Sequence, residues 1–280
     1  MLGDVWTDQG WSFGAAGGGA PRIRWYRRSG DGPTLVMAHG ITDSAACWSS
    51  VVEALPGVDI VAYDARGHGQ SDHAGSYAYR NHVADLTALL ERVANGPVVL
   101  VGHSMAGPHT AAVAAAFGER VRALVLVDPH WPERPQSADD YDLQGWMADI
   151  ARDARAPVAE LVARAEADHP MWSDLDRRTW AAAKTAVDQR VATWLESDDD
   201  INAWRDVVAA IECPTLLFIG DSAVDDNVTV RAAGAEDARR LNRHVTTVGV
   251  PGAGHSIHRD AFEVFMRSLT AFLGPRGLAL

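Results

Sequence analysis

Residues 102–106, GHSMA, contain the serine of this sequence that is best placed for covalent chemistry. A short apolar run precedes it at residues 97–101, and an alanine-rich stretch with helical character follows at residues 110–117. A serine on such a strand–turn–helix junction is lifted clear of the sheet, and only small residues fit beside it. The helix that follows directs its N–H groups and positive dipole end toward negative charge formed nearby. We therefore predict that Ser104 is a nucleophile.

A base must take the proton of that serine, because a free hydroxyl is weakly nucleophilic, and the base is normally a histidine held by a carboxylate. His255 stands in a glycine-rich segment, residues 250–256, directly after the last predicted strand. Loops at the carboxyl ends of parallel strands hold the sites of open α/β sheets. We therefore predict His255 as the base and expect most of the 11 histidines to be structural.

The acid that orients the histidine should follow a strand that precedes His255 in the chain. Asp221 directly follows an apolar run, and Asp225 lies in the loop beyond it. We favour Asp221 and keep Asp225 as the alternative. Asp128, after the apolar run that ends at Val127, is the third candidate.

Residues 39–41, HGI, follow another predicted strand and are candidates for an oxyanion hole. Gly40 allows a sharp backbone turn that would direct the N–H of Ile41 toward the serine. The N–H of Met105, at the start of the helix, would supply the second donor. Each such donor contributes on the order of 3 kcal/mol to stabilising the transition state. The alternative interpretation is an ordinary turn.

Strands and helices alternate along most of the chain, which predicts a mainly parallel sheet with helices on both faces. The valine- and leucine-rich strand candidates are typical of strands covered on both sides. Predicted strands cover residues 22–26, 34–38, 59–63, 98–101, 123–127, 214–219 and 245–250, and predicted helices cover residues 45–55, 79–94, 105–117, 232–241 and 261–273.

The alternation stops between residues 129 and 210, where no convincing strand occurs. Helical spacing there covers residues 143–154, 158–167, 179–195 and 201–211. We interpret residues 129–210 as a helical cap inserted into a core of residues 22–128 and 211–280. The glycine-rich beginning, residues 1–21, predicts a flexible arm, and residues 30–33 predict a turn.

Ten tryptophans are many for 280 residues, and six of them lie in the predicted cap. They indicate either aromatic packing or an apolar pocket for a hydrophobic substrate. We predict that Trp48, Trp131 and His130 contact substrate. The six cap tryptophans are Trp131, Trp146, Trp172, Trp180, Trp194 and Trp204.

A formal net charge of −12 and the absence of lysine and arginine clusters argue against nucleic acid and anionic lipid as partners. No apolar run approaches the roughly 20 residues of a membrane-spanning helix, and we expect no signal peptide. Cys47 and Cys213 are expected to be free thiols of a cytoplasmic protein. No metal or cofactor motif occurs, so we expect neither. The chain could be a monomer or a homodimer.

Four segments together resemble the α/β-hydrolase fold family, and they occur in that family's order: residues 39–40, 64–71, 102–107 and 251–255. The resemblance begins near residue 22 and implies an α/β fold with a mostly parallel sheet of about eight strands, a helical cap and a Ser–Asp–His triad. It makes Ser104 the nucleophile and His255 the base, with Ile41 and Met105 as oxyanion donors.

Two positions depart from the family pattern. Ala106 replaces the last glycine of the serine motif, and Ala223 stands where the usual acid would be. One variant of the acid motif, matched to residues 220–228, favours Asp221, whereas counting back from Val228 favours Asp225. The serine itself excludes the relatives that use an aspartate nucleophile, such as haloalkane dehalogenases and epoxide hydrolases.

These residues together predict a hydrolase that cleaves a small hydrophobic ester or lactone through an acyl-enzyme. A carbon–carbon hydrolase or a cofactor-free perhydrolase would use the same triad. A ligand-binding protein with little turnover on the same scaffold is the alternative from another class.

Overall fold

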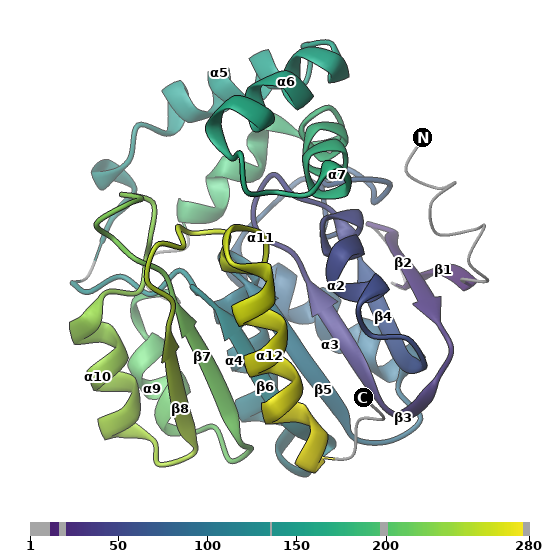
Figure 1. Cartoon of the computed structure of the whole chain (residues 1–280), viewed down its shortest axis with the longest axis vertical. Helices are drawn as coiled ribbons and strands as arrows, with labels where there is room; N and C mark the ends of the chain where they lie inside the picture. The colour runs from purple at the N-terminus through teal and green to yellow at the C-terminus, as the bar shows by residue number, and fades with distance from the viewer. Residues whose placement is uncertain (1–11, 17–20, 135, 197–200, 277–280) are drawn as a thin grey trace.

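Eight strands form one sheet in the computed structural model of the chain, which describes residues 12–16, 21–134, 136–196 and 201–276 (Figure 1). The strand order is β1-β2-β4-β3-β5-β6-β7-β8. Strand β2 runs antiparallel to both of its neighbours, and all the pairs from β4 to β8 are parallel. The strands are β1 (Ser12–Ala16), β2 (Ile23–Arg28), β3 (Asp31–Ala38), β4 (Val58–Tyr63), β5 (Val98–His103), β6 (Val121–Val127), β7 (Thr215–Ile219) and β8 (Val245–Gly249).

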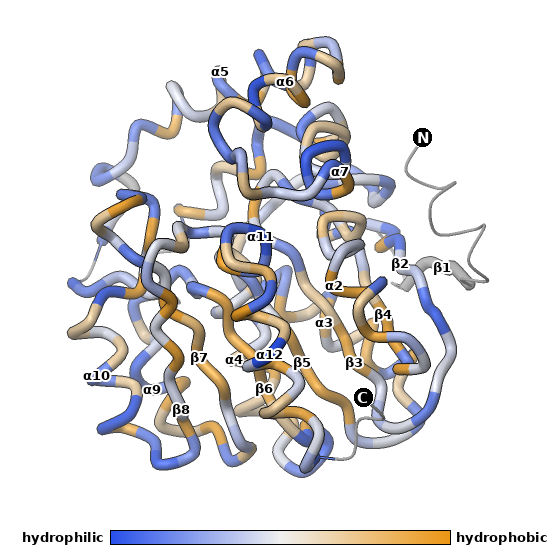
Figure 2. Tube along the Cα trace, in the orientation of Figure 1, coloured by the Kyte–Doolittle hydropathy of each residue, from blue (hydrophilic) through white to orange (hydrophobic). Residues whose placement is uncertain are grey.

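The central strands are buried on both faces, as their apolar sequences predict, and Figure 2 shows hydrophobic residues along β3, β5 and β6. Successive side chains alternate between two cores: in β3, Leu35 packs on one face and Val36 on the other. Helices α3 (Tyr79–Val93), α4 (Ala106–Phe117), α9 (Trp204–Ala209) and α10 (Ala232–Leu241) contribute to the Val36 face. Helices α2 (Ser49–Glu53), α11 (Ile257–Asp260) and α12 (Phe262–Leu273) contribute to the Leu35 face.

Helices α5 (Leu143–Asp153), α6 (Val158–Asp168) and α7 (Asp174–Lys184) and the 3₁₀ segment η4 (Gln189–Glu196) form a separate layer above the sheet in Figure 1. The long helix expected at residues 179–195 is divided between α7 and η4. The chain between them bonds to a core loop instead: Gly69 N–H donates to Ala186 O, and Asp188 N–H donates to Gly67 O. These bonds use backbone groups that a continuous helix would need, so the helix ends. The exact limits of the cap, 129–210, stay a prediction.

Two expectations for the first part of the chain were wrong. Residues 12–16, assigned to a flexible arm, form β1 and pair with β2, whereas the rest of residues 1–20 lies outside the described residues. The turn expected at 30–33 does not occur there: β2 ends at Arg28 and β3 begins at Asp31, whose N–H donates to Gly57 O, so only residues 29–30 connect the two strands.

The short elements η1 (Ala45–Trp48), η2 (Gly118–Arg120), η3 (Ala138–Asp140) and η5 (Gly274–Arg276) complete the chain. The described residues contain no helix with the length and apolar character needed to span a bilayer. The cytoplasmic location stays a prediction.

Leu100, fully buried in β5, is a suitable probe of the sheet core. We expect Leu100→Ala to lower the free energy of unfolding by about 2–5 kcal/mol, because the lost side chain leaves a cavity between the sheet and its helices. Urea denaturation measures the change. Met171→Ala, at a side chain that is 78% exposed, is the control and should shift stability by less than about 0.5 kcal/mol.

Candidate active site

Ser104 lies on the sharp turn between β5 and α4, as the sequence predicts. Its φ of +52° is a strained value for a residue with a side chain. Its N–H donates to Val127 O on the neighbouring strand β6. A Cβ added at Gly102 would lie 2.3 Å from Thr110 Oγ1, which explains why a glycine precedes the turn. The methyl group of Ala106 is accommodated in the core, so this departure from the family pattern does not disturb the turn.

His255 contacts Ser104 directly. The Ser104 Oγ lies 2.8 Å from His255 Nε2, and the His255 Nδ1 lies 2.5 Å from Asp128 Oδ2. With the imidazole proton on Nδ1 and donated to Asp128, Nε2 is left to accept the hydroxyl proton of the serine. The hydroxyl, the imidazole and the carboxylate therefore form one continuous chain of hydrogen bonds.

Asp128 is the carboxylate that reaches His255, and its side chain is completely buried. It directly follows β6, and its own φ is +39°. Its Oδ1 accepts the Val230 N–H at 2.9 Å and its Oδ2 accepts the Thr229 N–H at 3.0 Å. Since a buried carboxylate needs hydrogen-bond donors, these backbone groups satisfy the Asp128 oxygens and fix the orientation of the side chain.

Asp221, our first choice for the acid, does not contact the imidazole, and neither does the carboxylate of Asp225. Asp221 accepts the N–H groups of Gly252 and Ala223. Asp225 Oδ2 accepts the backbone N–H of His255 at 2.9 Å, and its Oδ1 accepts from Asn227. Both aspartates therefore hold the loop that carries His255 by its backbone. Donated hydrogen bonds from Gly252 and Ala223 keep the pKa of Asp221 below its ordinary value.

The loop of residues 40–43 passes close to Ser104. A Cβ added at Gly40 would lie 2.7 Å from the His103 Nδ1 and 3.2 Å from the Ser104 Cβ, so only glycine permits this approach. Ile41 and Met105 both line the cavity in which Ser104 lies. Within the described part of the chain, neither backbone N–H of these two residues has a hydrogen-bond acceptor. Two unpaired donors beside a hydroxyl are suited to bind an anionic oxygen.

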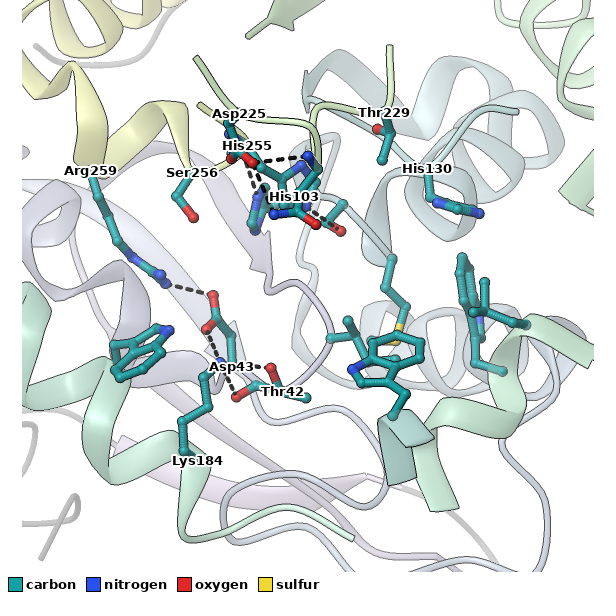
Figure 3. A pocket seen from close by; sticks show the side chains of 18 of the residues that line it. Thr42, Asp43, His103, His130, Lys184, Asp225, Thr229, His255, Ser256 and Arg259 are labelled. Carbon is teal, nitrogen blue, oxygen red and sulfur yellow. Dashed lines mark hydrogen bonds and ion pairs between the residues drawn. The ribbon is translucent and has the colours of Figure 1, made fainter. Parts of the chain in front are cut away.

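A cavity of about 550 Å³ opens over Ser104 at the carboxyl ends of the strands (Figure 3). Its walls come from the core loops and from the cap, and they include five aromatic side chains. The aromatic residues are Tyr141, Trp146, Trp172, Trp180 and Trp194. Three charged side chains, Asp43, Lys184 and Arg259, form one side of the cavity. No group of metal-ligating side chains that could hold an ion was found among the described residues.

Of the three residues expected to contact substrate, only His130 lines this cavity. Burial, together with the nearby His255, lowers the pKa of His130 to about 4, so its ring is neutral at pH 7. Trp48 is wrongly assigned: it lies in the core, with its ring centroid 4.5 Å from that of His258. Trp131 is also wrongly assigned. Its ring stacks on that of Trp204, with 4.8 Å between the ring centroids, and it does not line the cavity.

Sequence reasoning gave Asp128 too low a rank, and it did not single out Asp43, Lys184 or Arg259. Asp128 directly follows β6, whereas Gly220 separates Asp221 from β7. The useful signal was the alanine at position 223, where the family pattern expects an acid, because a missing acid after β7 favours one after β6.

Asp128→Asn separates the two assignments of the acid. We expect kcat for a 4-nitrophenyl ester to fall roughly 10⁴-fold, because the amide favours the wrong imidazole tautomer and does not stabilise the imidazolium. Asp221→Asn is the matched control, since its amide oxygen can still accept the Gly252 N–H, and it should retain most of the activity. A large loss in the control with little loss in Asp128→Asn would contradict the geometry.

Comparisons with known proteins agree with this architecture. A family profile described as alpha/beta hydrolase fold matches residues 33–262. The chain is 28% identical over 262 residues to the 2-(acetamidomethylene)succinate hydrolase of Mesorhizobium japonicum, with 88% of this chain and 90% of that protein covered. It is 35% identical over 268 residues to the sn-1-specific diacylglycerol lipase ABHD11 of Xenopus tropicalis, with 89% of this chain and 80% of that protein covered.

A solved structure of E-2-(acetamidomethylene)succinate hydrolase matches 94% of this chain and 99% of its own, with a TM-score of 0.77 at 21% identity. At that identity the likeness concerns the fold. The predicted family and its mostly parallel sheet are therefore confirmed. The profile match and the two long sequence matches agree that this chain belongs to the alpha/beta hydrolase fold family.

Proposed function

We propose that this chain is a serine hydrolase that cleaves carboxylic esters or lactones through an acyl-enzyme. The observation that carries the proposal is the hydrogen-bonded chain from Ser104 through His255 to Asp128, which opens onto an aromatic cavity. The unpaired N–H groups of Ile41 and Met105 beside it support the same chemistry.

Acylation begins when the Ser104 Oγ attacks the carbonyl carbon of the substrate while His255 Nε2 takes the hydroxyl proton. The carbonyl oxygen becomes an anion, which the N–H groups of Ile41 and Met105 stabilise. The positive charge formed on the imidazole is stabilised by the buried Asp128 carboxylate, which accepts its Nδ1 proton in a hydrogen bond. His255 then donates its proton to the leaving alcohol, and the ester bond breaks.

Deacylation repeats these steps with water as the nucleophile. His255 takes a proton from water, the hydroxide attacks the acyl carbon, and the proton returns to the Ser104 Oγ as the acid leaves. A lactone would release its acid and its alcohol as a single ring-opened product. His255 accepts a proton and then donates it in each half of the reaction.

The cavity walls favour a substrate with an apolar or aromatic group, because five aromatic side chains line a space of about 550 Å³. The relatives' names support the reaction class, since both are hydrolases, but they describe chemically different substrates. A panel of 4-nitrophenyl esters and lactones, neutral and carboxylate-bearing, would define the preference.

Ser104→Ala tests the function. The wild type should hydrolyse 4-nitrophenyl butyrate and be labelled by a fluorophosphonate at one site per chain, and the variant should lose both properties because the nucleophile is absent. Mass spectrometry of the labelled peptide locates the modified residue. Stoichiometric labelling without turnover of any ester or lactone would contradict the proposal, and activity on a vinylogous diketone alone would favour carbon–carbon hydrolysis.

Trp180→Ala and Trp204→Ala form a matched pair that tests the cavity. Trp180 lines it, so we expect its removal to change the preference for acyl-chain length. Trp204 is buried away from the cavity, stacks on Trp131 and donates to Pro132 O, so its removal should lower stability by about 3–5 kcal/mol with the preference unchanged. Ratios of kcat/KM across an ester series and thermal melting measure the two effects, and the reverse result would contradict them.

A further inference from the structure

Three charged side chains from distant segments meet at one side of the cavity (Figure 3). Asp43 belongs to the loop after β3, Arg259 to α11, and Lys184 is the last residue of cap helix α7. The Asp43 Oδ2 lies 2.5 Å from Arg259 Nη2, and its Oδ1 lies 3.5 Å from Lys184 Nζ. This Lys184–Asp43–Arg259 cluster therefore joins the loop beside the serine to the helix just after His255 and to the cap.

The Asp43 carboxylate is ionised despite its burial. Burial alone would raise the pKa of the Asp43 carboxyl, but the charges of Arg259 and Lys184 outweigh it and hold that pKa below its ordinary value. Burial lowers the pKa of the Lys184 ammonium, and the charge of Asp43 opposes this shift. A buried ion pair often stabilises a protein no more than apolar residues of similar size would. We therefore attribute the cluster to the position in which it holds the 40–43 loop, and not to a gain in stability.

Lys184 also holds the backbone of the 40–43 loop. Its Nζ donates to Thr42 Oγ1 at 2.6 Å and to Thr42 O at 3.1 Å. Thr42 has a φ of +61°, a strained conformation for a β-branched residue that persists only where the surroundings enforce it. On its other side the Thr42 N–H donates to His68 Nε2 at 3.2 Å.

Thr42 directly follows Ile41, whose N–H is one of the two unpaired donors beside Ser104. The Ile41 N–H belongs to the peptide group between Gly40 and Ile41. A rotation of Thr42 to an ordinary negative φ would turn the next peptide group, between Ile41 and Thr42, and would so displace Ile41 together with its N–H. Lys184 opposes that rotation from the cap, and Asp43 opposes it from the next position in the chain. The two cations of the cluster also contact tryptophans that line the cavity. Lys184 Nζ lies 4.8 Å from the centroid of the Trp180 ring, and the Arg259 guanidinium lies 4.9 Å from the centroid of the Trp172 ring.

From this geometry we infer that Lys184 is a positioning residue for the oxyanion hole, through which the placement of the cap determines whether the Ile41 N–H is aligned. The inference rests on the proposed hydrolase function. Lys184 acts through Thr42 and Asp43 and forms no bond with the reacting atoms. Its removal should therefore weaken binding of the transition state more than binding of the substrate.

The test compares Lys184→Met and Lys184→Ala with Lys184→Arg, which keeps the charge and the donors. With 4-nitrophenyl butyrate we expect kcat to fall roughly 10- to 100-fold in the first two variants, because a misplaced catalytic group costs up to about 10²-fold. KM should change by less than about threefold, and affinity for a trifluoromethyl ketone that forms an oxyanion with Ser104 should fall by the same factor as kcat. Lys184→Arg should restore most of the loss.

Arg164→Met is the matched control. Arg164 is a cap cation that pairs with Asp153 at 2.6 Å and, like Lys184, lies over the Trp180 ring, 5.3 Å from its centroid. It differs from Lys184 in having no hydrogen bond or ion pair with the 40–43 loop, so it tests the loop contacts separately from the Trp180 contact. This variant should keep wild-type kcat, and thermal melting of all the variants reports loss of folding separately.

Two results would overturn the inference. One is an unchanged kcat and ketone affinity in Lys184→Met or Lys184→Ala, and the other is a loss that Lys184→Arg does not reduce or that Arg164→Met reproduces. The wild-type reaction with a fluorophosphonate separates this failure from failure of the function. A labelled, active wild type with equally active Lys184 variants rejects only the role of Lys184, whereas an unlabelled and inactive wild type rejects the proposed function with it.

Discussion

The hydrogen bond between His255 and the buried Asp128 is the interaction on which the candidate site depends. It fixes which imidazole nitrogen faces Ser104, and it couples the last loop of the chain to the middle of the sheet. Hydrogen bonds from neighbouring loops hold both partners of this bond in place. Thr229 and Val230 saturate the carboxylate from one side, and Asp225 holds the backbone of His255 from another.

Sheet topology explains why these groups meet. Strands β5 and β6 are parallel neighbours in which His103 pairs with Val127, so the residues that follow them, Ser104 and Asp128, leave the sheet side by side. The N–H of Ser104 donates to Val127 O and strengthens this register. An acid at the end of β7 would lie one strand farther from the nucleophile. The loop after β7 instead contributes carboxylates that hold the histidine loop by its backbone.

The order of the core elements and the pair of Ser104 with His255 could be predicted from local sequence, because apolar runs and small residues at a tight turn are local signals. Asp128 could not be chosen from local sequence, since other aspartates also follow strands and the pairing of β5 with β6 is what brings Asp128 beside Ser104. The tryptophans show the same limit. Trp48 and Trp180 are the same residue type and both lie in helical segments, yet Trp48 lies in the core and Trp180 lines the cavity. Contacts between the cap and the core depend on long-range packing that no periodicity reveals.

Thr42, Ser104 and Asp128 are the non-glycine residues with positive φ in the described part of the chain, and all three lie at or beside the proposed reaction centre. Strained backbone of this kind costs of order 1–3 kcal/mol per residue and is kept only where neighbours enforce it. At these three positions the backbone conformation that places the catalytic groups therefore lowers the stability of the fold. A search for heat-resistant variants would tend to relax them toward glycine or asparagine, and the resulting proteins would endure higher temperatures as less competent catalysts.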